Sequence, residues 1–211
     1  MTLRPSFAAM LRDRRGSGAA EFALVLPLLL VFLLGILDVS RAMYVMNMAT
    51  KATQMGARFA VVTDVIPPQL VAADYTGVAA CDPGGTTVCG TGDQIVNTAA
   101  LGTLSCTSTA CSCSGTCPSA TTIDATAFTR LVDHMKLYYP ELKPANVKIE
   151  FAGSGLGFAG DPTGTDVIPL VTVKLTGLTF SPVTLFSIAS FTLPDFATTL
   201  SDESAVGQIS N

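Results

Sequence analysis

The feature that most constrains this chain is a run of residues without any charge, from Phe22 to Leu37. An exposed helix of this composition is unstable in water, so the run must enter a bilayer or a deep core. As a helix it would be about 24 Å long, slightly short of a hydrocarbon core. Adding Ser17–Glu21 lengthens the helix to roughly 31 Å, which spans a membrane. The sequence therefore predicts a transmembrane segment over residues 17–38.

The charges around this segment predict its orientation. Residues 1–16 carry four arginines and one aspartate, a net charge of +3, whereas the whole chain carries −4. Residues 17–211 therefore carry −7, and the basic charge is concentrated before the span. By the positive-inside rule, we expect a single-pass protein of the inner (cytoplasmic) membrane with a cytoplasmic N-terminus and a periplasmic or otherwise extracytoplasmic C-terminal domain. The acidic exported part argues against nucleic acid as a partner.

Glu21 lies at the edge of the run, where an unpaired carboxylate in lipid costs roughly several kcal/mol. Such a residue indicates a function. From the residues alone, three interpretations stay open. The span is a plain signal anchor, a cleaved secretory signal peptide, or the helix of a protein that is processed at a specific site just before it.

The third interpretation rests on a longer motif. Basic residues, then Gly16, four small residues, Glu21 and Phe22 precede the apolar helix. This string resembles the processing site of type IV prepilins, in the variant used by the tight-adherence (Tad or Flp) pilus. Residues 18–30 and 35–41 further resemble the TadE-like family of minor pseudopilins, which share a small-residue–Glu-Phe-Ala start, a proline in the helix and a Gly–Ile–x–Asp/Glu exit. The resemblance covers about residues 15–41.

The resemblance implies a function and a set of partners. A prepilin peptidase would cut between Gly16 and Ser17 and remove residues 1–16 as a cytoplasmic leader. Glu21, next to Phe22, would pair with the new N-terminal amine and set the register between subunits. The partners would be this peptidase, other pilins and pseudopilins, the inner-membrane assembly platform and membrane lipid. The protein would act in assembly or initiation of the pilus and could join the fibre.

A function of a different class is the alternative. The chain would then be an unprocessed, signal-anchored binding or adhesion module of the envelope with a disulfide-rich extracytoplasmic domain. Its N-terminus would remain Met1, whereas a processed pseudopilin would begin at Ser17.

The helical pattern continues beyond the span. Pro27 lies inside the helix, where it removes one backbone hydrogen bond and tends to cause a kink. After Asp38 no proline occurs before Pro67, which predicts one helix from about Gly18 to about Val62. Residues 39–66 form its amphipathic extension, with small residues and methionine on the apolar face. That face can pack against the protein's own domain or against neighbouring helices.

Residues 67–120 are rich in Gly, Thr, Ser and Cys and poor in large apolar side chains. Such a segment cannot pack on its own hydrophobic groups, so we expect disulfides outside the cytoplasm and no free thiol. A zinc site is disfavoured because the cysteine spacing does not fit and the only histidine is distant. Cys81 with Cys89 is a plausible pair, but the remaining pairing is open. The six cysteines are Cys81, Cys89, Cys106, Cys111, Cys113 and Cys117.

Residues 121–200 read as a small α+β domain, and residues 201–211 as a loose polar tail. The fold class is therefore α+β: a long N-terminal membrane-spanning helix, then a domain with an antiparallel sheet, one further helix and a cysteine-rich loop. Helical spacing, alternation and glycine content predict the elements. They are a helix over Thr121–Tyr139, strands at Val147–Phe151, Val171–Leu175 and about Phe191–Leu193, and a glycine-rich loop over Gly153–Asp166.

No residue pattern predicts an enzyme or a cofactor. Gly155, Gly157 and Gly160 spell GxGxxG, but turn residues follow where a dinucleotide site needs a helix. A lone histidine on a helix, such as His134, is usually structural. Asp161 and Asp166 lack the spacing of a calcium-binding EF-hand loop.

Overall fold

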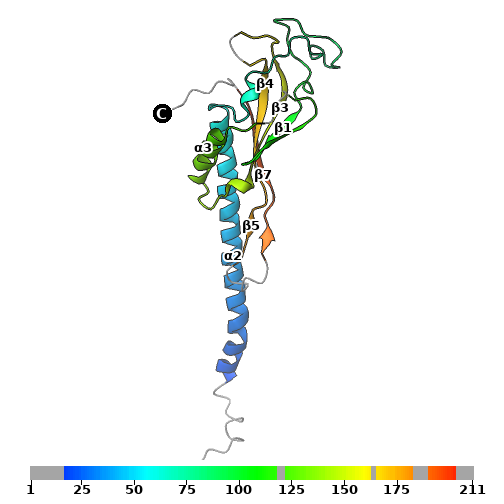
Figure 1. Cartoon of the computed structure of the whole chain (residues 1–211). Helices are drawn as coiled ribbons and strands as arrows, with labels where there is room; N and C mark the ends of the chain where they lie inside the picture. The colour runs from blue at the N-terminus through cyan, green and yellow to red at the C-terminus, as the bar shows by residue number, and fades with distance from the viewer. Residues whose placement is uncertain (1–16, 118–121, 163–164, 183–189, 203–211) are drawn as a thin grey trace, which may run out of the picture. The chain divides into compact units, whose positions relative to one another are not determined.

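The computed structural model describes residues 17–117, 122–162, 165–182 and 190–202 (Figure 1). The chain divides into two units, one made of residues 1–43 and 180–191 and the other of residues 44–179 and 192–211. The elements, in chain order, are α2 (Ser17–Ala60), η2 (Pro68–Leu70), β1 (Thr103–Cys106), β2 (Cys111–Ser114), α3 (Ala125–Lys136), η3 (Pro144–Asn146), β3 (Val147–Gly157), β4 (Val167–Leu175), β5 (Thr179–Phe180), β6 (Phe191–Thr192) and β7 (Phe196–Ser201).

The predicted long helix is present as α2. It is continuous over 44 residues, runs through Pro27 and ends at Ala60, close to the predicted end at Val62. Its length is about 66 Å. The first unit contains α2 up to Met43, and the second begins at Tyr44. The apolar span and the amphipathic extension of this helix therefore belong to different units.

The second unit is built on an antiparallel sheet with the strand order β2-β1-β3-β4-β7. Each strand pairs antiparallel with its neighbour, and β3 and β4 pair over most of their length, from Val147 opposite Leu175 to Gly153 opposite Pro169. Alternate residues of β3 and β4 are buried, as expected for a sheet with one face on a core. The predicted α+β class is confirmed.

Helix α3 covers part of this core, beside the C-terminal half of α2 (Figure 1). Asp124 makes the N-cap of this helix. Its Oδ1 accepts hydrogen bonds from the backbone N–H groups of Thr126 and Ala127 at 2.8 and 3.0 Å. The buried face of α3 consists of Ala127, Phe128, Leu131, Val132 and Met135.

Small residues in the C-terminal half of α2 form a face that packs inside the second unit. Ala49, Ala52 and Ala57 are fully buried. A Cβ on Gly56 would lie only 2.8 Å from Cγ and Sδ of Met135, so the absence of a side chain there lets α3 come close. Between residues 49 and 60, the small-residue face is therefore a core face of the protein's own domain.

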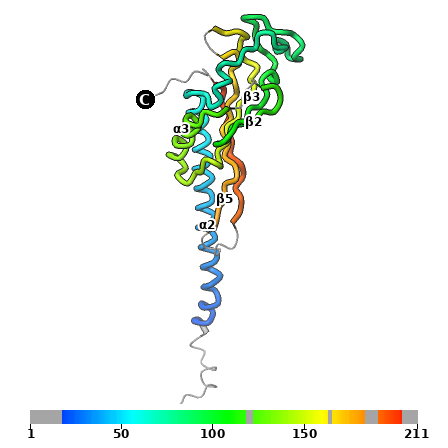
Figure 2. The backbone as a smooth tube through the Cα atoms, in the orientation of Figure 1, coloured from blue at the N-terminus to red at the C-terminus, as the bar shows by residue number. Residues whose placement is uncertain are grey.

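The cysteine-rich segment contributes more structure than predicted. The sequence predicted a loop over residues 67–120, but Thr103–Cys106 and Cys111–Ser114 pair as strands β1 and β2. Strand β1 also pairs with β3, so the hairpin extends the main sheet. Figure 2 shows the preceding loops, in blue-green, at one end of this sheet. Serine and cysteine have no strong strand preference, which is why local sequence did not predict these strands.

All six cysteines form disulfides, each between cysteines that are neighbours in sequence order. The pairs are Cys81–Cys89, Cys106–Cys111 and Cys113–Cys117. The first is the pair that spacing made plausible. The second joins the two ends of β1 and β2 where the hairpin turns. No cysteine sulfur is left to bind zinc.

Three further predictions about the C-terminal part differ from the structure in their bounds or in their pairing. The predicted glycine-rich loop begins too early, because β3 continues from Phe151 to Gly157 with an irregularity after Gly153. The predicted third strand at Phe191 is β6, which pairs with β5 in a separate two-stranded sheet. The fifth strand of the main sheet is β7, which ends at Ser201, the first residue of the predicted tail, whereas residues 203–211 lie outside the described residues.

Asp166 holds three backbone segments together in the second unit. Its carboxylate is buried and accepts hydrogen bonds from the backbone N–H groups of Tyr75, Gly160 and Asp161 at 2.7, 2.9 and 3.0 Å. Burial of Tyr75, with the charge of Asp166 as a second cause, raises the pKa of the Tyr75 hydroxyl to about 12. The phenol must therefore stay protonated for this packing to persist.

This arrangement predicts alkaline destabilisation. Because the pKa of Tyr75 is higher in the folded chain than its usual value near 10, its contribution is complete below about pH 10 and is lost as the pH rises toward about 12. The free energy of unfolding should fall by up to about 3 kcal/mol across this range. Urea titrations of the detergent-solubilised chain measure it. Tyr75→Phe should make the dependence shallower but not flat, since burial also raises the pKa of Tyr139. An identical dependence in the variant would contradict the assignment.

Candidate functional site

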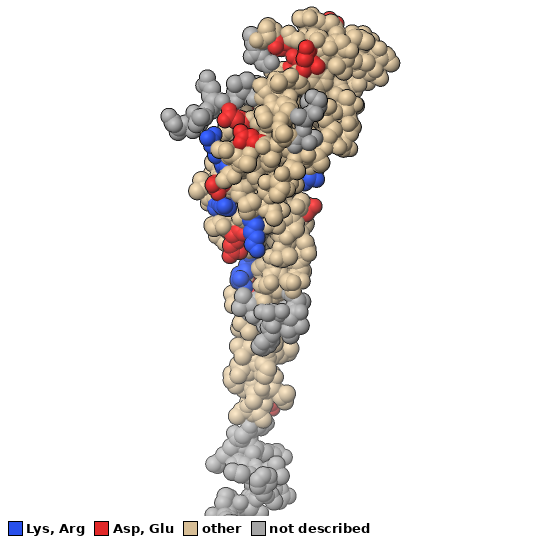
Figure 3. All heavy atoms as spheres, in the orientation of Figure 1, with Lys and Arg blue, Asp and Glu red and all other residues tan. Residues whose placement is uncertain are grey.

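The candidate site is the N-terminal part of α2, in the first unit. Here large apolar side chains are exposed instead of buried: Phe22, Leu24, Leu28, Val31 and Phe32 are 65–80% exposed. Leu30, Leu34 and Leu37 are also 40–57% exposed. Successive helical residues are turned by about 100°, so the exposed apolar side chains together point to all sides of the helix. Figure 3 shows this stretch almost entirely in tan, with neither blue nor red atoms along most of its length. A helix that is apolar all round requires lipid or other helices around it.

Among the described residues, one helix is long and apolar enough to cross a membrane. It covers Gly18–Ala60, with a mean hydropathy of 2.7 in its most apolar part. The described part of the chain therefore has one candidate membrane span, near the N-terminus, as the sequence predicted.

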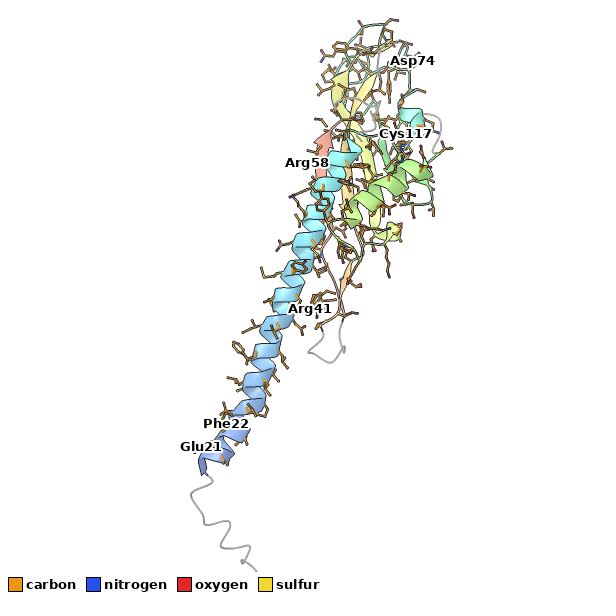
Figure 4. The ribbon with its side chains drawn as sticks, turned by 90° about the vertical axis from the view of Figure 1, so that its left-hand side faces the viewer. Glu21, Phe22, Arg41, Arg58, Asp74 and Cys117 are labelled. Atoms are coloured by element: carbon orange, nitrogen blue, oxygen red, sulfur yellow. A yellow bond between two sulfur atoms is a disulfide. The ribbon has the colours of Figure 1, made fainter. Side chains whose placement is uncertain are left out.

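The predicted processing residues lie at the start of this helix. Gly16 is outside the described residues, and Ser17 is the first residue of α2. Glu21 and Phe22 follow one turn later, near the free end of the helix in Figure 4, and both are exposed. Ser17 and Glu21 are four residues apart, so their positions share a helix face and differ by about 6 Å along the axis. The helix thus places a carboxylate one turn from the end that cleavage after Gly16 would create.

Pro27 lies within the helix, which continues on both sides of it. Because proline has no N–H group, the carbonyl of Ala23 loses its usual helical hydrogen bond at this point. In a membrane such a carbonyl is satisfied by neighbouring helices or by local adjustment.

Polar and aromatic side chains mark the other end of the apolar stretch. Asp38 is 5% exposed, and its carboxylate lies 3.6 Å from the guanidinium of Arg41. The Arg41 guanidinium carbon lies 5.6 Å from the centre of the Phe180 ring, a cation–π arrangement. Phe180 in turn contacts Phe191, with ring centres 5.3 Å apart. Sequence analysis missed this cluster, although the uncharged segment around Phe180 and Phe191 was a signal for it.

The structure places the residues considered for enzymatic chemistry as follows. Gly155, Gly157 and Gly160 lie in and just after β3, and the next described element is strand β4, so no helix N-terminus faces them. His134 stacks on Phe59 with ring centres 4.5 Å apart, and burial lowers its pKa. Within the described part of the chain, no three His, Cys, Asp or Glu side chains are grouped to hold a metal ion.

Comparison with known proteins gives one finding. A family model described as TadE-like protein matches residues 16–58. The match begins at the predicted processing site and ends two residues before the end of α2. It confirms the resemblance deduced from residues 15–41 and extends it along the helix. No curated protein and no solved structure matches the chain.

Proposed function

Residues 16–58 are a TadE-like segment of the kind found in components of Tad pilus systems, and from this premise we propose that the protein is a minor pseudopilin that acts in assembly or initiation of a Tad-type pilus. Its role is structural. The observation that carries the proposal is the apolar surface on all sides of α2 beyond Glu21, within the segment that the TadE-like family model matches. A helix of this kind functions by insertion and by contact with similar helices.

The proposed life cycle follows from the charges. Arg4, Arg12, Arg14 and Arg15 keep the N-terminus in the cytoplasm, so the second unit is exported. A membrane-embedded prepilin peptidase then cuts between Gly16 and Ser17. Removal of residues 1–16 also removes the positive charge that held this end in the cytoplasm. The processed subunit is left with its apolar helix and Glu21, ready to join other pilins and pseudopilins on the inner-membrane assembly platform.

Disulfides support an exported location for the second unit. Three disulfides within residues 81–117 persist only in an oxidising compartment, such as the periplasm. A cytoplasmic location of this segment would leave its cysteines reduced. The arrangement therefore agrees with a cytoplasmic N-terminus and one membrane crossing.

Processing provides the test of the proposal. Gly16→Val should block cleavage, because the peptidase accepts only a very small residue on the leader side of the cut. The variant should then keep Met1 as its first residue and migrate at the size of the unprocessed chain. N-terminal sequencing of the protein from its native membrane measures this, and the unmodified protein should begin at Ser17.

Gly18→Val is the matched control. It makes the same change two residues away, where a Cβ meets no atom within 4 Å, and it should be processed normally. If the unmodified chain keeps Met1 in cells that contain the peptidase, the protein is instead a signal-anchored envelope module. If Gly16→Val is cut as efficiently as the control, the assignment of the cleavage site is wrong.

A further inference from the structure

Two phenylalanines in the first unit lie at the level where the apolar span ends. Phe180 closes β5 and Phe191 opens β6, and both belong to the same unit as residues 1–43. Phe180 lies against the Arg41 guanidinium. Figure 4 shows the position of Arg41 on the helix. Phe191 packs on Phe180 but is still 47% exposed, so part of its ring has no cover.

The position of Arg41 fixes the depth of this pair. The uncharged run ends at Leu37, and Arg41 is four residues later, about 6 Å farther along the axis. The polar interface on each side of the hydrocarbon core is about 5–8 Å thick. If Leu37 ends at the edge of the hydrocarbon, Arg41 and the Phe180 ring stacked on it lie within this interfacial layer. Phe191, which contacts Phe180, lies at the same level.

Charge and composition agree with contact to lipid. Between Lys174 and Asp195 the sequence has no charged residue, so nothing in this part of the chain opposes approach to the apolar region. The side chain of Arg41 is 53% exposed although it pairs with Asp38 and stacks on Phe180. About half of this side chain is therefore accessible at the level of the lipid phosphates, which have the complementary charge. A guanidinium beside aromatic rings at one level is an arrangement that suits a membrane surface.

We propose that Phe180, Phe191 and Arg41 form a second membrane contact of this protein, at the boundary between headgroups and acyl chains of the leaflet where the span exits. The exposed ring of Phe191 inserts beside α2, and Arg41 binds lipid phosphate. Together with the span, this contact fixes the height and the rotation of the helix in the bilayer. The proposal requires that α2 crosses the membrane, but it does not depend on a role in a pilus.

The test uses a feature of the composition, namely that the chain has no tryptophan. Phe191→Trp places a single fluorescent reporter at a position with room for it. The full chain is reconstituted in vesicles of phosphatidylethanolamine and phosphatidylglycerol, in which a fraction of the lipid carries bromine on the acyl chain, either near the headgroup or near the terminal methyl. We expect emission from the reporter to fall about twofold with bromine near the headgroup and much less with deep bromine.

Two other reporters calibrate the depth. Phe32→Trp, in the middle of the apolar stretch, should be quenched most by the deep bromine. Phe158→Trp, at an equally exposed phenylalanine of the second unit, should keep its emission with both lipids. Arg41→Gln, combined with Phe191→Trp, should weaken quenching in vesicles with phosphatidylglycerol, because the phosphate contact is lost.

Either of two results would overturn the proposal. An emission maximum typical of water, without quenching, would show that Phe191 faces solvent. A blue-shifted maximum without quenching would show that protein covers it. Neither result bears on cleavage after Gly16, so the proposed function is tested separately by N-terminal sequencing.

Discussion

A Glu21→Gln variant is expected to insert and to be processed normally but to form few or no pili. In the proposed function, cleavage after Gly16 would create an ammonium group on Ser17, one helical turn from the Glu21 carboxylate. Both charges would then lie at or just inside the lipid boundary, where an unpaired charge is costly. Pairing within one chain, or between the amine of one subunit and the carboxylate of the next, removes both costs. Glutamine cannot provide this charge, so an incoming subunit loses its preferred height.

The number of pili per cell should fall at least about tenfold, which corresponds to about 1.4 kcal/mol in the association of a subunit. Counting pili by electron microscopy measures this, and crosslinking to pilin partners should decrease in parallel. Glu21→Asp, which keeps the charge on a side chain one methylene shorter, should restore part of the assembly. Glu141→Gln removes an exposed carboxylate of the second unit and should leave pili unchanged. Normal pili in Glu21→Gln would reduce Glu21 to a partner of the helix dipole, worth about 0.3–1 kcal/mol.

The largest loss of stability is expected from Gly157→Ala. Gly157 has φ +140°, a region that residues with a side chain rarely adopt, and a Cβ there would overlap the carbonyl oxygen of Asp166 and lie 3.0 Å from Cα of Val167. Val167 is the first residue of strand β4, and Asp166 directly precedes it. Their backbone atoms cannot move without breaking the pairing of Gly157 with Val167. The carbonyl of Gly157 also accepts from the N–H group of Ile95. We expect a loss of about 3 kcal/mol or more in the free energy of unfolding.

Gly92→Ala is the control for the backbone conformation alone. Gly92 also has a positive φ, +87°, but a Cβ there meets no atom within 4 Å. This variant should lose only about 1–2 kcal/mol. Urea titrations of both variants, in the full chain in detergent, give the comparison. Equal losses would mean that the overlap with Asp166 is relieved at little cost and that Gly157 is required for its φ only.

The sequence predicted best those features that depend on charge and on long periodic patterns. The absence of charge between Phe22 and Leu37 was enough to predict the span, and the absence of proline before Pro67 was enough to predict the extension of α2. Strands β3 and β4 were predicted in their central parts, where Ile149 and Val173 alternate with polar neighbours. In each case the signal lies within one element.

Features that depend on partners distant in the chain were missed. Strand β7 is defined by its pairing with β4. Its residues alternate between half-buried and exposed and none is fully buried, so the alternation of apolar and polar residues in its sequence is weak. The contact of Arg41 with Phe180 joins residues about two-thirds of the chain apart. The extension of β3 through Gly157 was hidden by glycine, which usually marks a loop but here permits the close approach of a neighbouring strand. No local pattern contains this information.

The order of the disulfides has a consequence for export. In the proposed orientation the chain emerges on the exported side in the order of its sequence, and the paired cysteines are separated by only 8, 5 and 4 positions, without any overlap between pairs. The first cysteine of each pair therefore reaches the oxidising side just before its partner. By then, both cysteines of the preceding pair have already emerged. Of the fifteen possible pairings, an oxidase that joins cysteines in order of emergence makes this one directly. The native bridges can thus form during translocation without an isomerase, at the pace at which the chain emerges.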